Sequence, residues 1–387
     1  MNVIHAAKLA ILGLASLLLL ACAHPAGVRD DPEALRRVVD ATVLPLMERN
    51  AVPGMAVAVT VDGRPSFFHY GVAARDTGRA VTAGTLFEIG SLSKAFTATL
   101  AAYARETGAL SFSDKASTFM PALAGSAFDG ISLLELGTYT AGGLPLQFPE
   151  EVTDEASLVA FYRNWRPAFP AGTQRLYSNP SIGLFGHLAA NSMGAPFDTL
   201  MEGRLLPMLG LGETYLRVPP ARMGDYAWGY NRELAPVRVN AGMLDAEAYG
   251  VKTSARDMLR FVEANMGAGR LDPALRRALA ATHTGHYQVG GMAQALGWET
   301  YAWPASLDVL LAGNSTAMAL QAHAVTPAPP PQGDILVNKT GSTNGFGAYA
   351  AFVPARRIGV VLLANRNYPN AERVRAAYAI LQALEGR

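Results

Sequence analysis

The chain has 387 residues, half of them apolar, and its formal net charge is +1. That length supports a large core and one or two domains. The near-neutral charge, without a basic stripe, gives no electrostatic reason to expect a nucleic-acid partner.

Two residue types are unusually scarce. Cys22 is the only cysteine, so neither an intrachain disulfide nor a cysteine-based metal site is expected. The 32 cationic residues include only five lysines. Because lysine, unlike arginine, can give up its proton when buried, each lysine is a candidate for chemistry.

Residues 1–23 have the pattern of an export signal peptide. A positive charge precedes an apolar run over residues 9–21, and small residues follow. The run is too short to favour a membrane span. Its end has two interpretations. Peptidase cleavage would release a soluble chain from His24, which is favoured, whereas a lipoprotein box would place a lipid on Cys22.

The first elements after the signal are a helix and a hairpin. Pro32 stands early in a helical pattern that runs to about Arg49. Apolar runs over 55–61 and 65–70 flank an Asp-Gly pair, which is a strong hairpin signal.

The middle of the chain, from about residue 109 to 285, is predicted to consist of helices and loops. A segment over 212–249 is long, irregular and aromatic, and such loops usually cover a site. The predicted helices span 133–138, 157–165, 183–191, 197–208 and 255–266.

Strand patterns return near the end of the chain, at 335–339, 347–353 and 358–364, before a closing helix at 372–384. Strands at both ends around a helical middle predict a two-domain α/β (α+β) fold with an inserted helical domain. We expect the sheet domain to comprise 24–108 and 290–387, the helical domain to comprise 109–289, and the site to lie in the cleft between them.

Ser91-Leu92-Ser93-Lys94 joins a hydroxyl to an amine at the start of a helical pattern. Positions i and i+3 share a helix face, so the two side chains can touch. Near the positive end of a helix the amine loses some preference for its proton. Lys94 is therefore a candidate base and Ser91 a candidate nucleophile.

Two further patterns follow, Tyr177-Ser178-Asn179 and Lys339-Thr340-Gly341. Each is weak alone, and a Tyr-x-Asn pattern also begins at Tyr162 and Tyr368. Tyr177, however, is predicted to lie on a loop, where catalytic groups tend to be held. The three motifs in this order are a strong signal.

With these motifs the chain resembles the class C serine β-lactamases, a group of penicillin-recognising enzymes. The resemblance extends over the mature chain, including 139–147, 245–252, 296–299 and 363–370. It implies an antiparallel sheet flanked by helices and built from both chain ends. Asn338 departs from the family, which often has His before this Lys-Thr-Gly, and is expected to tune the surroundings of the second amine.

The resemblance also implies catalytic roles. Ser91 attacks the lactam carbonyl, and Lys94 and Tyr177 share the general-base role. The backbone N–H groups of Ser91 and Ser342 receive the oxyanion, and Lys339 supplies positive charge near Tyr177. The loop Glu used by another large class for deacylation has no matching motif here, so Tyr177 is expected to activate the hydrolytic water.

Substrate contacts follow from the same resemblance. Lys339, Thr340 and Asn370 are expected to receive the substrate carboxylate. Gln147 and Asn179 are expected to bind the acylamino side chain, while Tyr249 lines the site. The further expected substrate-binding residues are Gly341, Ser342 and Asn367.

Three functions remain open at this point: a β-lactamase, a D-alanyl-D-alanine peptidase or related esterase, and a penicillin-binding sensor that does not turn over. The Lys-Thr-Gly motif argues against the esterases, and the whole-chain resemblance favours the lactamase. We expect a periplasmic monomer that acts on small-molecule β-lactams without cofactor, metal or nucleic acid. His283 and His286 lack a further ligand at useful spacing, so they do not predict a metal site.

Overall fold

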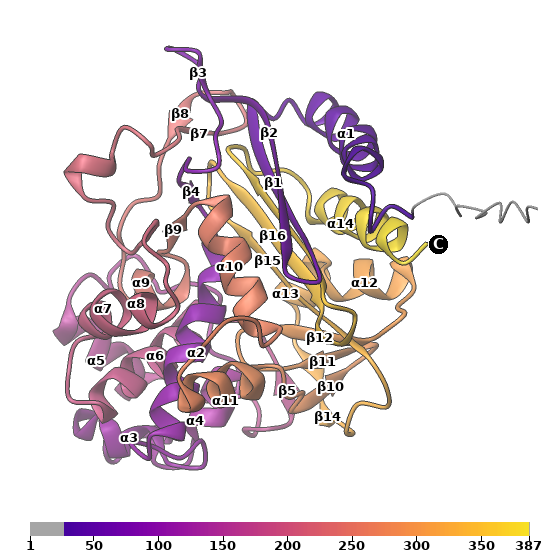
Figure 1. Cartoon of the computed structure of the whole chain (residues 1–387). Coiled ribbons are helices and arrows are strands. Elements are labelled where there is room, and N and C mark those ends of the chain that lie inside the picture. The colour runs from indigo at the N-terminus through magenta and orange to yellow at the C-terminus, as the bar shows by residue number, and fades with distance from the viewer. Residues whose placement is uncertain (1–26, 387) are drawn as a thin grey trace, which may run out of the picture.

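The computed structural model describes residues 27–386 (Figure 1). The predictions for the signal peptide and for Cys22 fall outside these residues. Within the described range, no helix combines the length and apolarity needed to cross a membrane.

A ten-stranded antiparallel sheet is built from both ends of the chain, which confirms the predicted fold class. β1 (Gly54–Val61) pairs with β17 (Ile358–Ala364) along its length and so joins the N-terminal hairpin to the C-terminal strands (Figure 1). The sheet order is β14-β10-β11-β12-β15-β16-β17-β1-β2-β3. The other strands of this sheet are β2 (Arg64–Ala74), β3 (Arg79–Ala80), β10 (Tyr287–Val289), β11 (Met292–Gln294), β12 (Glu299–Ala302), β14 (Thr326–Pro327), β15 (Ile335–Ser342) and β16 (Gly347–Val353).

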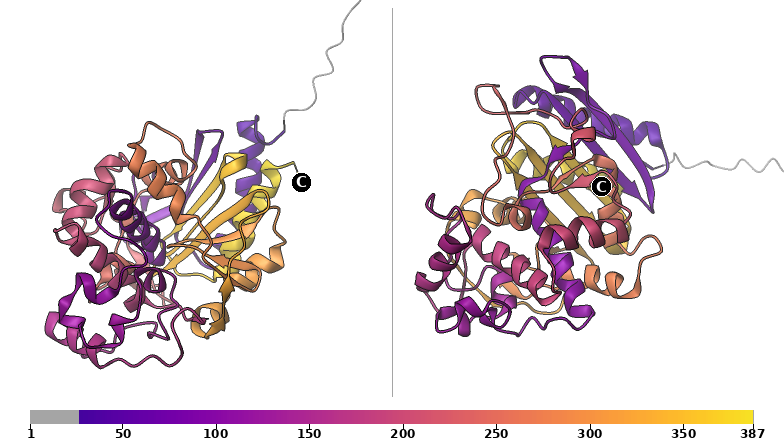
Figure 2. Two further views of the ribbon diagram at one scale, coloured as in Figure 1. Left: turned by 90° about the horizontal axis from the view of Figure 1, so that it is seen from below. Right: turned by 90° about the vertical axis from the view of Figure 1, so that its left-hand side faces the viewer.

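The central strands are buried on both faces because alternate side chains enter two cores. Met55 and Val57 pack with α1 (Pro32–Arg49) and α14 (Asn370–Leu384), whereas Ala56 belongs to the core that contains the helical half. Figure 2 shows the helical half on one side of the sheet and α1 with α14 on the other. Double burial explains why these strands have continuous apolar runs in the sequence.

The helical half is organised around α2 (Ser93–Glu106), whose residues from Ser93 to Ala104 are all buried. A helix surrounded by protein needs no polar face, so its small residues pack closely on every side. The remaining helices are α3 (Ala116–Phe119), α4 (Leu133–Gly137), α5 (Glu155–Asn164), α6 (Asn179–Ser192), α7 (Phe197–Leu200), α8 (Leu206–Met208), α9 (Asp245–Ala248), α10 (Ala255–Asn265), α11 (Pro273–Thr282), α12 (Leu307–Gly313) and α13 (Thr316–Leu320).

Most predicted helices are present, with two differences. The helix predicted over 197–208 contains a π-helical turn, Met201–Leu205, just before Pro207, which lacks the N–H of a regular helix. The helices α11 and α12 and the short helices α3, α9 and α13 were not predicted. The long segment 212–249 is largely irregular, as expected. Short strands outside the main sheet are β4 (Phe87–Glu88), β5 (Gln174–Arg175), β6 (Thr214–Tyr215), β7 (Gly229–Tyr230), β8 (Pro236–Val237), β9 (Lys252–Thr253) and β13 (His323–Ala324).

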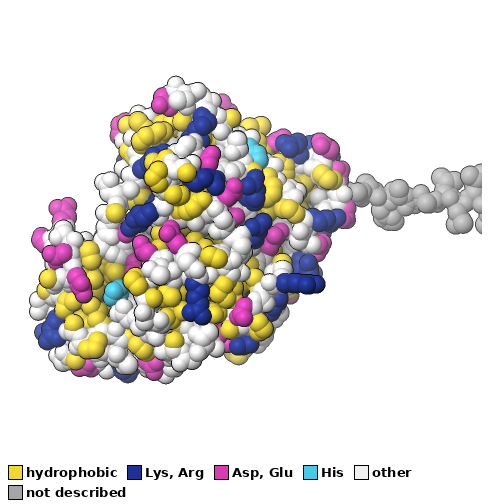
Figure 3. Space-filling view, turned by 60° about the vertical axis from the view of Figure 1, so that its left-hand side comes forward, with side chains coloured by type: hydrophobic (Ala, Val, Ile, Leu, Met, Phe, Trp, Pro, Cys, Tyr) yellow, Lys and Arg dark blue, Asp and Glu magenta, His cyan; other side chains and the backbone are white. Residues whose placement is uncertain are grey.

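The division into domains at residues 108 and 289 stays a prediction. β10 already belongs to the main sheet although it precedes residue 290. On the face shown in Figure 3, acidic and basic side chains are interspersed and do not gather into a field of one sign.

Candidate active site

Ser91 lies in a 3-10 turn, Gly90–Leu92, that leads directly into α2. Lys94 is fully buried in the first turn of this helix. Its Nζ donates to Ser91 Oγ at 3.0 Å, to Asn179 Oδ1 at 2.6 Å and to the Ala248 carbonyl at 2.7 Å. The predicted contact between Ser91 and Lys94 is present, and two other elements, α6 and α9, hold the amine in place.

Tyr177 lies on the loop between β5 and α6, as the sequence predicted. The Nζ atoms of Lys94 and Lys339 each lie 5.0 Å from the centroid of its ring. Its hydroxyl is buried and has no hydrogen-bond partner of standard geometry among the described residues. The three motifs therefore meet around one phenol.

Burial and the neighbouring charges together set the pKa values of this cluster. Burial alone raises the pKa of the Tyr177 phenol, but Lys339, Lys94 and the approach of the Ser91 hydroxyl outweigh it and leave the pKa below its ordinary value. Burial is the main cause that lowers the pKa of Lys94, and Lys339 adds to it. Buried groups whose pKa values are shifted by specific charged neighbours are typical of acid–base sites.

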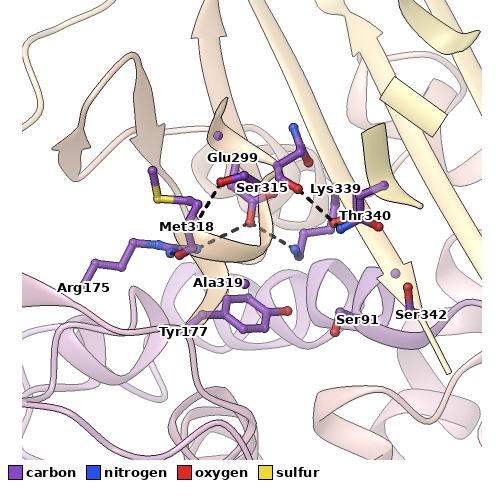
Figure 4. A pocket seen from close by; sticks show the side chains of 14 residues that line it. Ser91, Arg175, Tyr177, Glu299, Ser315, Met318, Ala319, Lys339, Thr340 and Ser342 are labelled. Atoms are coloured by element: carbon purple, nitrogen blue, oxygen red, sulfur yellow. Dashed lines mark hydrogen bonds and ion pairs between the residues drawn. The ribbon is translucent and has the colours of Figure 1, made fainter. Parts of the chain in front are cut away.

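Lys339, on β15, is bound to a buried carboxylate that the sequence reasoning did not assign to the site. Its Nζ lies 3.0 Å from Glu299 Oε1, and Arg175 Nη2 lies 3.9 Å from the same oxygen (Figure 4). Burial opposes the charge on Lys339, yet Glu299 and then Tyr177 raise its pKa above the usual value. The one sequence signal for Glu299 was its place in segment 296–299, which is part of the resemblance described above.

The glycine of the Lys-Thr-Gly motif allows β15 to approach the nucleophile. A Cβ on Gly341 would collide with the Ile89 carbonyl oxygen and lie 2.8 Å from the Leu92 amide nitrogen. Gly90, with φ of +51°, lies against the Ser342 backbone in the same way. The strand and the turn thus touch backbone to backbone, which places Ser342 beside Ser91.

A cavity opens over these groups (Figure 4). Seven predicted site residues line it: Ser91, Tyr177, Lys339, Thr340, Gly341, Ser342 and Asn370. Residues that the prediction did not include also line it, among them Arg175, Glu299, Asn314, Ser315 and Met318. These come mainly from β12 and the α12–α13 segment.

The other predicted substrate-binding residues do not line this cavity. Gln147 and Tyr249 line a second cavity with part of the long loop, including Met243. Asn179 accepts a hydrogen bond from Lys94. Asn367 accepts a hydrogen bond from Arg373 and does not line either cavity.

Asn338 is fully buried and does not touch the Lys339 amine. Its amide donates to the Glu299 carbonyl oxygen, and its oxygen accepts from Asn314 and Tyr349. Consecutive side chains of a strand point to opposite faces, so Asn338 braces the back of the strand that carries Lys339. Its effect on that amine stays a prediction.

An accessible serine beside a buried lysine and a phenol of lowered pKa has the chemistry of a serine acyl-transfer enzyme. A family model described as beta-lactamase matches residues 39–385. A β-lactamase of Pseudomonas fluorescens is 58% identical over 91% of this chain and 99% of that protein. A β-lactamase of Escherichia coli (strain K12) is 45% identical over 92% of this chain and 95% of that protein.

Solved structures agree with these relatives. A class C β-lactamase in complex with cefoxitin has a TM-score of 0.88 at 48% identity, over 91% of this chain and 99% of that chain. A β-lactamase/D-alanine carboxypeptidase from Pseudomonas syringae has a TM-score of 0.88 at 50% identity, over 90% of this chain and 99% of that chain. The chain therefore belongs to the β-lactamase family, among its class C members, and its activity is β-lactam hydrolysis.

Proposed function

We propose that the enzyme opens the lactam amide through an acyl intermediate on Ser91. The observation that carries this proposal is the position of Lys94 Nζ, which donates to Ser91 Oγ at 3.0 Å and lies 5.0 Å from the centroid of the Tyr177 ring. Lys94 and Tyr177, both with lowered pKa, take the proton from the Ser91 hydroxyl as it attacks the carbonyl carbon. The proton then passes to the lactam nitrogen as the amide bond breaks.

The negative charge on the carbonyl oxygen needs donors in place before the reaction. We assign the backbone N–H groups of Ser91 and Ser342 to this role, as the resemblance implies. The close approach of β15 to the turn that carries Ser91, which Gly341 permits, supports the assignment.

Hydrolysis of the acyl-enzyme requires an activated water. Among the residues that line the main cavity, Tyr177 is the phenol flanked by two lysine amines, and its hydroxyl has no protein hydrogen-bond partner of standard geometry among the described residues. Tyr177 is therefore our candidate activator of that water.

The substrate spans both cavities in this proposal. Its carboxylate meets Lys339, Thr340 and Asn370, beside Gly341 and Ser342. Its acylamino group meets Asn179 and continues to Gln147 and Tyr249 in the second cavity. Asn367 acts on this site only through Arg373. A relative that binds cefoxitin supports cephalosporins as substrates.

The enzyme is proposed to work as a monomer in the periplasm. The apolar run of residues 9–21 supports export. The mass of the mature N-terminus tests whether the chain begins at His24 or carries a lipid on Cys22.

A chromogenic cephalosporin tests the proposal. Purified protein should turn over many equivalents, keep its rate in EDTA and lose it to a boronic acid. One stoichiometric burst without turnover would contradict the lactamase and favour a sensor or peptidase.

The carboxypeptidase names of two similar structures make release of the terminal D-alanine from a peptide a second candidate function. D-Alanine release from a peptide that ends in D-alanyl-D-alanine measures it. Release at a rate comparable to cephalosporin hydrolysis would support it.

A further inference from the structure

A buried arginine lies behind the strand that forms one wall of the site. Arg373 is fully buried in the first turns of α14, and no carboxylate of the described residues forms an ion pair with it. The centroid of the Tyr368 ring lies 4.8 Å from the guanidinium carbon. A buried cation near a helix N-terminus, without a carboxylate partner among the described residues, costs stability.

The guanidinium instead binds backbone and side-chain oxygens at the end of β15. Its Nη1 donates to the Gly341 carbonyl oxygen at 2.7 Å and to Ser342 Oγ at 2.9 Å. Its Nη2 donates to Asn367 Oδ1 at 2.7 Å and to the Tyr368 carbonyl oxygen. Its Nε has no partner among the described residues. The guanidinium is therefore held through its Nη1 and Nη2 atoms.

The Gly341 carbonyl and the Ser342 N–H belong to one peptide unit. That unit is planar and resonance-stabilised, so its C=O and N–H groups polarise together. A cation bound to the oxygen makes the N–H a stronger donor and fixes the direction in which it points. The N–H of Ser342 is one of the two donors assigned above to the oxyanion.

The strand beside β15 leaves room for the guanidinium. Gly347 pairs with Ser342 across the ladder, and a Cβ at Gly347 would lie 2.7 Å from Arg373 Nη2 and 2.9 Å from its Cζ. A larger residue there would push the guanidinium away from the peptide.

We propose that Arg373 is a positioning residue that orients and polarises the Gly341–Ser342 peptide so that its N–H stabilises the oxyanion. The inference rests on the proposed role of Ser342. Arg373 acts indirectly, because it touches the strand and not the substrate.

Arg373→Met and Arg373→Lys test it, with infrared difference spectra of the acyl-enzyme made from a cephalosporin ¹³C-labelled at the lactam carbonyl. A weaker donor leaves the ester carbonyl bond stronger, so the Met variant should shift its band to higher wavenumber. It should also lose about tenfold in kcat/KM and in boronic-acid affinity, less than the loss of a whole oxyanion donor. The Lys variant keeps the positive charge. Its carbonyl band, kcat/KM and boronic-acid affinity should therefore lie between those of the native enzyme and those of the Met variant.

Arg276→Met is the matched control. Arg276 donates to two backbone carbonyls, of Gly267 and Gly269, on an exposed surface, and its loss should not move the band. A merely structural Arg373 would lower the unfolding temperature and leave the band in place, which would overturn the inference.

Gly347→Ala serves if Arg373→Met does not fold. It should give the same upward shift, and an unmoved band would again overturn the inference. Failure of the proposed function is separate, because then the native enzyme would form no acyl-enzyme on Ser91.

Discussion

At the scale of single residues, the candidate site contains more buried positive charge than negative charge. Lys94, Lys339 and Arg175 are all buried near Tyr177, and Glu299 is the one carboxylate that pairs with this group among the described residues. The excess positive charge lowers the pKa of the phenol despite its burial. A cluster of this kind prepares a base without a histidine.

Lys94→Arg should abolish most activity although it keeps a positive charge. Arginine is effectively never deprotonated, so the variant lacks a usable base. We expect kcat/KM for a cephalosporin to fall by about 10²–10⁴-fold. Lys115→Arg, at an exposed lysine, is the control and should match the native enzyme. Full activity of Lys94→Arg would refute the base role.

Glu299→Gln should move the pH profile of kcat/KM toward lower pH. Glu299 raises the pKa of Tyr177, Lys94 and Lys339, so its neutralisation lowers all three. The acid limb, where the bases become protonated, and the alkaline limb, where Lys339 loses its proton, should shift in the same direction. Asp334→Asn, which removes the surface partner of Arg356, should leave the profile in place. A shift to higher pH would contradict this electrostatic assignment.

At the scale of elements, the site depends on where β15 meets the turn before α2. The glycines at this contact are required by the neighbouring backbone and not by turn geometry alone. The short helix α9 also helps to position the site, because its Ala248 carbonyl oxygen accepts a hydrogen bond from Lys94. Short elements therefore position the reactive side chains that lie on or beside the longer elements.

Gly341→Ala should damage both stability and activity. The added Cβ collides with the backbone of Ile89 and Leu92, which cannot rotate away as a side chain can. We expect a loss of at least about 1–3 kcal/mol in unfolding free energy, with weaker boronic-acid binding. Gly203→Ala, where no atom lies within 4 Å of the added Cβ, should be neutral or slightly stabilising by denaturant unfolding. Equal effects of the two variants would contradict the packing argument.

Glu247 on α9 makes stability depend on pH. Burial raises its pKa from 4.5 to about 8, with Asp198 and Asp245 adding to the effect and Arg217 opposing it. Because the folded state holds this proton more tightly, the contribution is full below pH 4.5 and is lost as pH rises to about 8.

Glu247→Gln should therefore gain stability over the native chain by about 1.4 kcal/mol per pH unit across that window. Denaturant unfolding at the two ends of the window measures the gain. Glu48→Gln, at an exposed position, should give a curve parallel to that of the native chain. A constant difference between Glu247→Gln and the native chain would refute the raised pKa.

Sequence patterns predicted the long elements and seven of the residues that line the main cavity. The hairpin, α1, α14 and the three C-terminal strands had strong local signals. The short strands β10 to β12 did not, because their two to four ladder pairs per side are set by tertiary contacts. Glu299 on β12 and Arg175 on β5 were missed as site residues because only the fold brings them to Lys339.

At the scale of the whole molecule, three distant parts of the chain close one site. Residues near the N-terminus supply Ser91 and Lys94, the helical half supplies Tyr177, and the C-terminal strands supply Lys339. The pairing of β1 with β17 holds these parts in one sheet. Activity should therefore be lost together with global unfolding.

The central claim is that Ser91 becomes acylated and is then freed by hydrolysis. Rapid-quench mass spectrometry during cephalosporin turnover, followed by peptide mapping, measures this directly. The account predicts an adduct on the peptide that contains Ser91, present during turnover, absent once substrate is exhausted, and never formed by a folded Ser91→Ala variant. An adduct on another residue, or sustained turnover by Ser91→Ala, would contradict it.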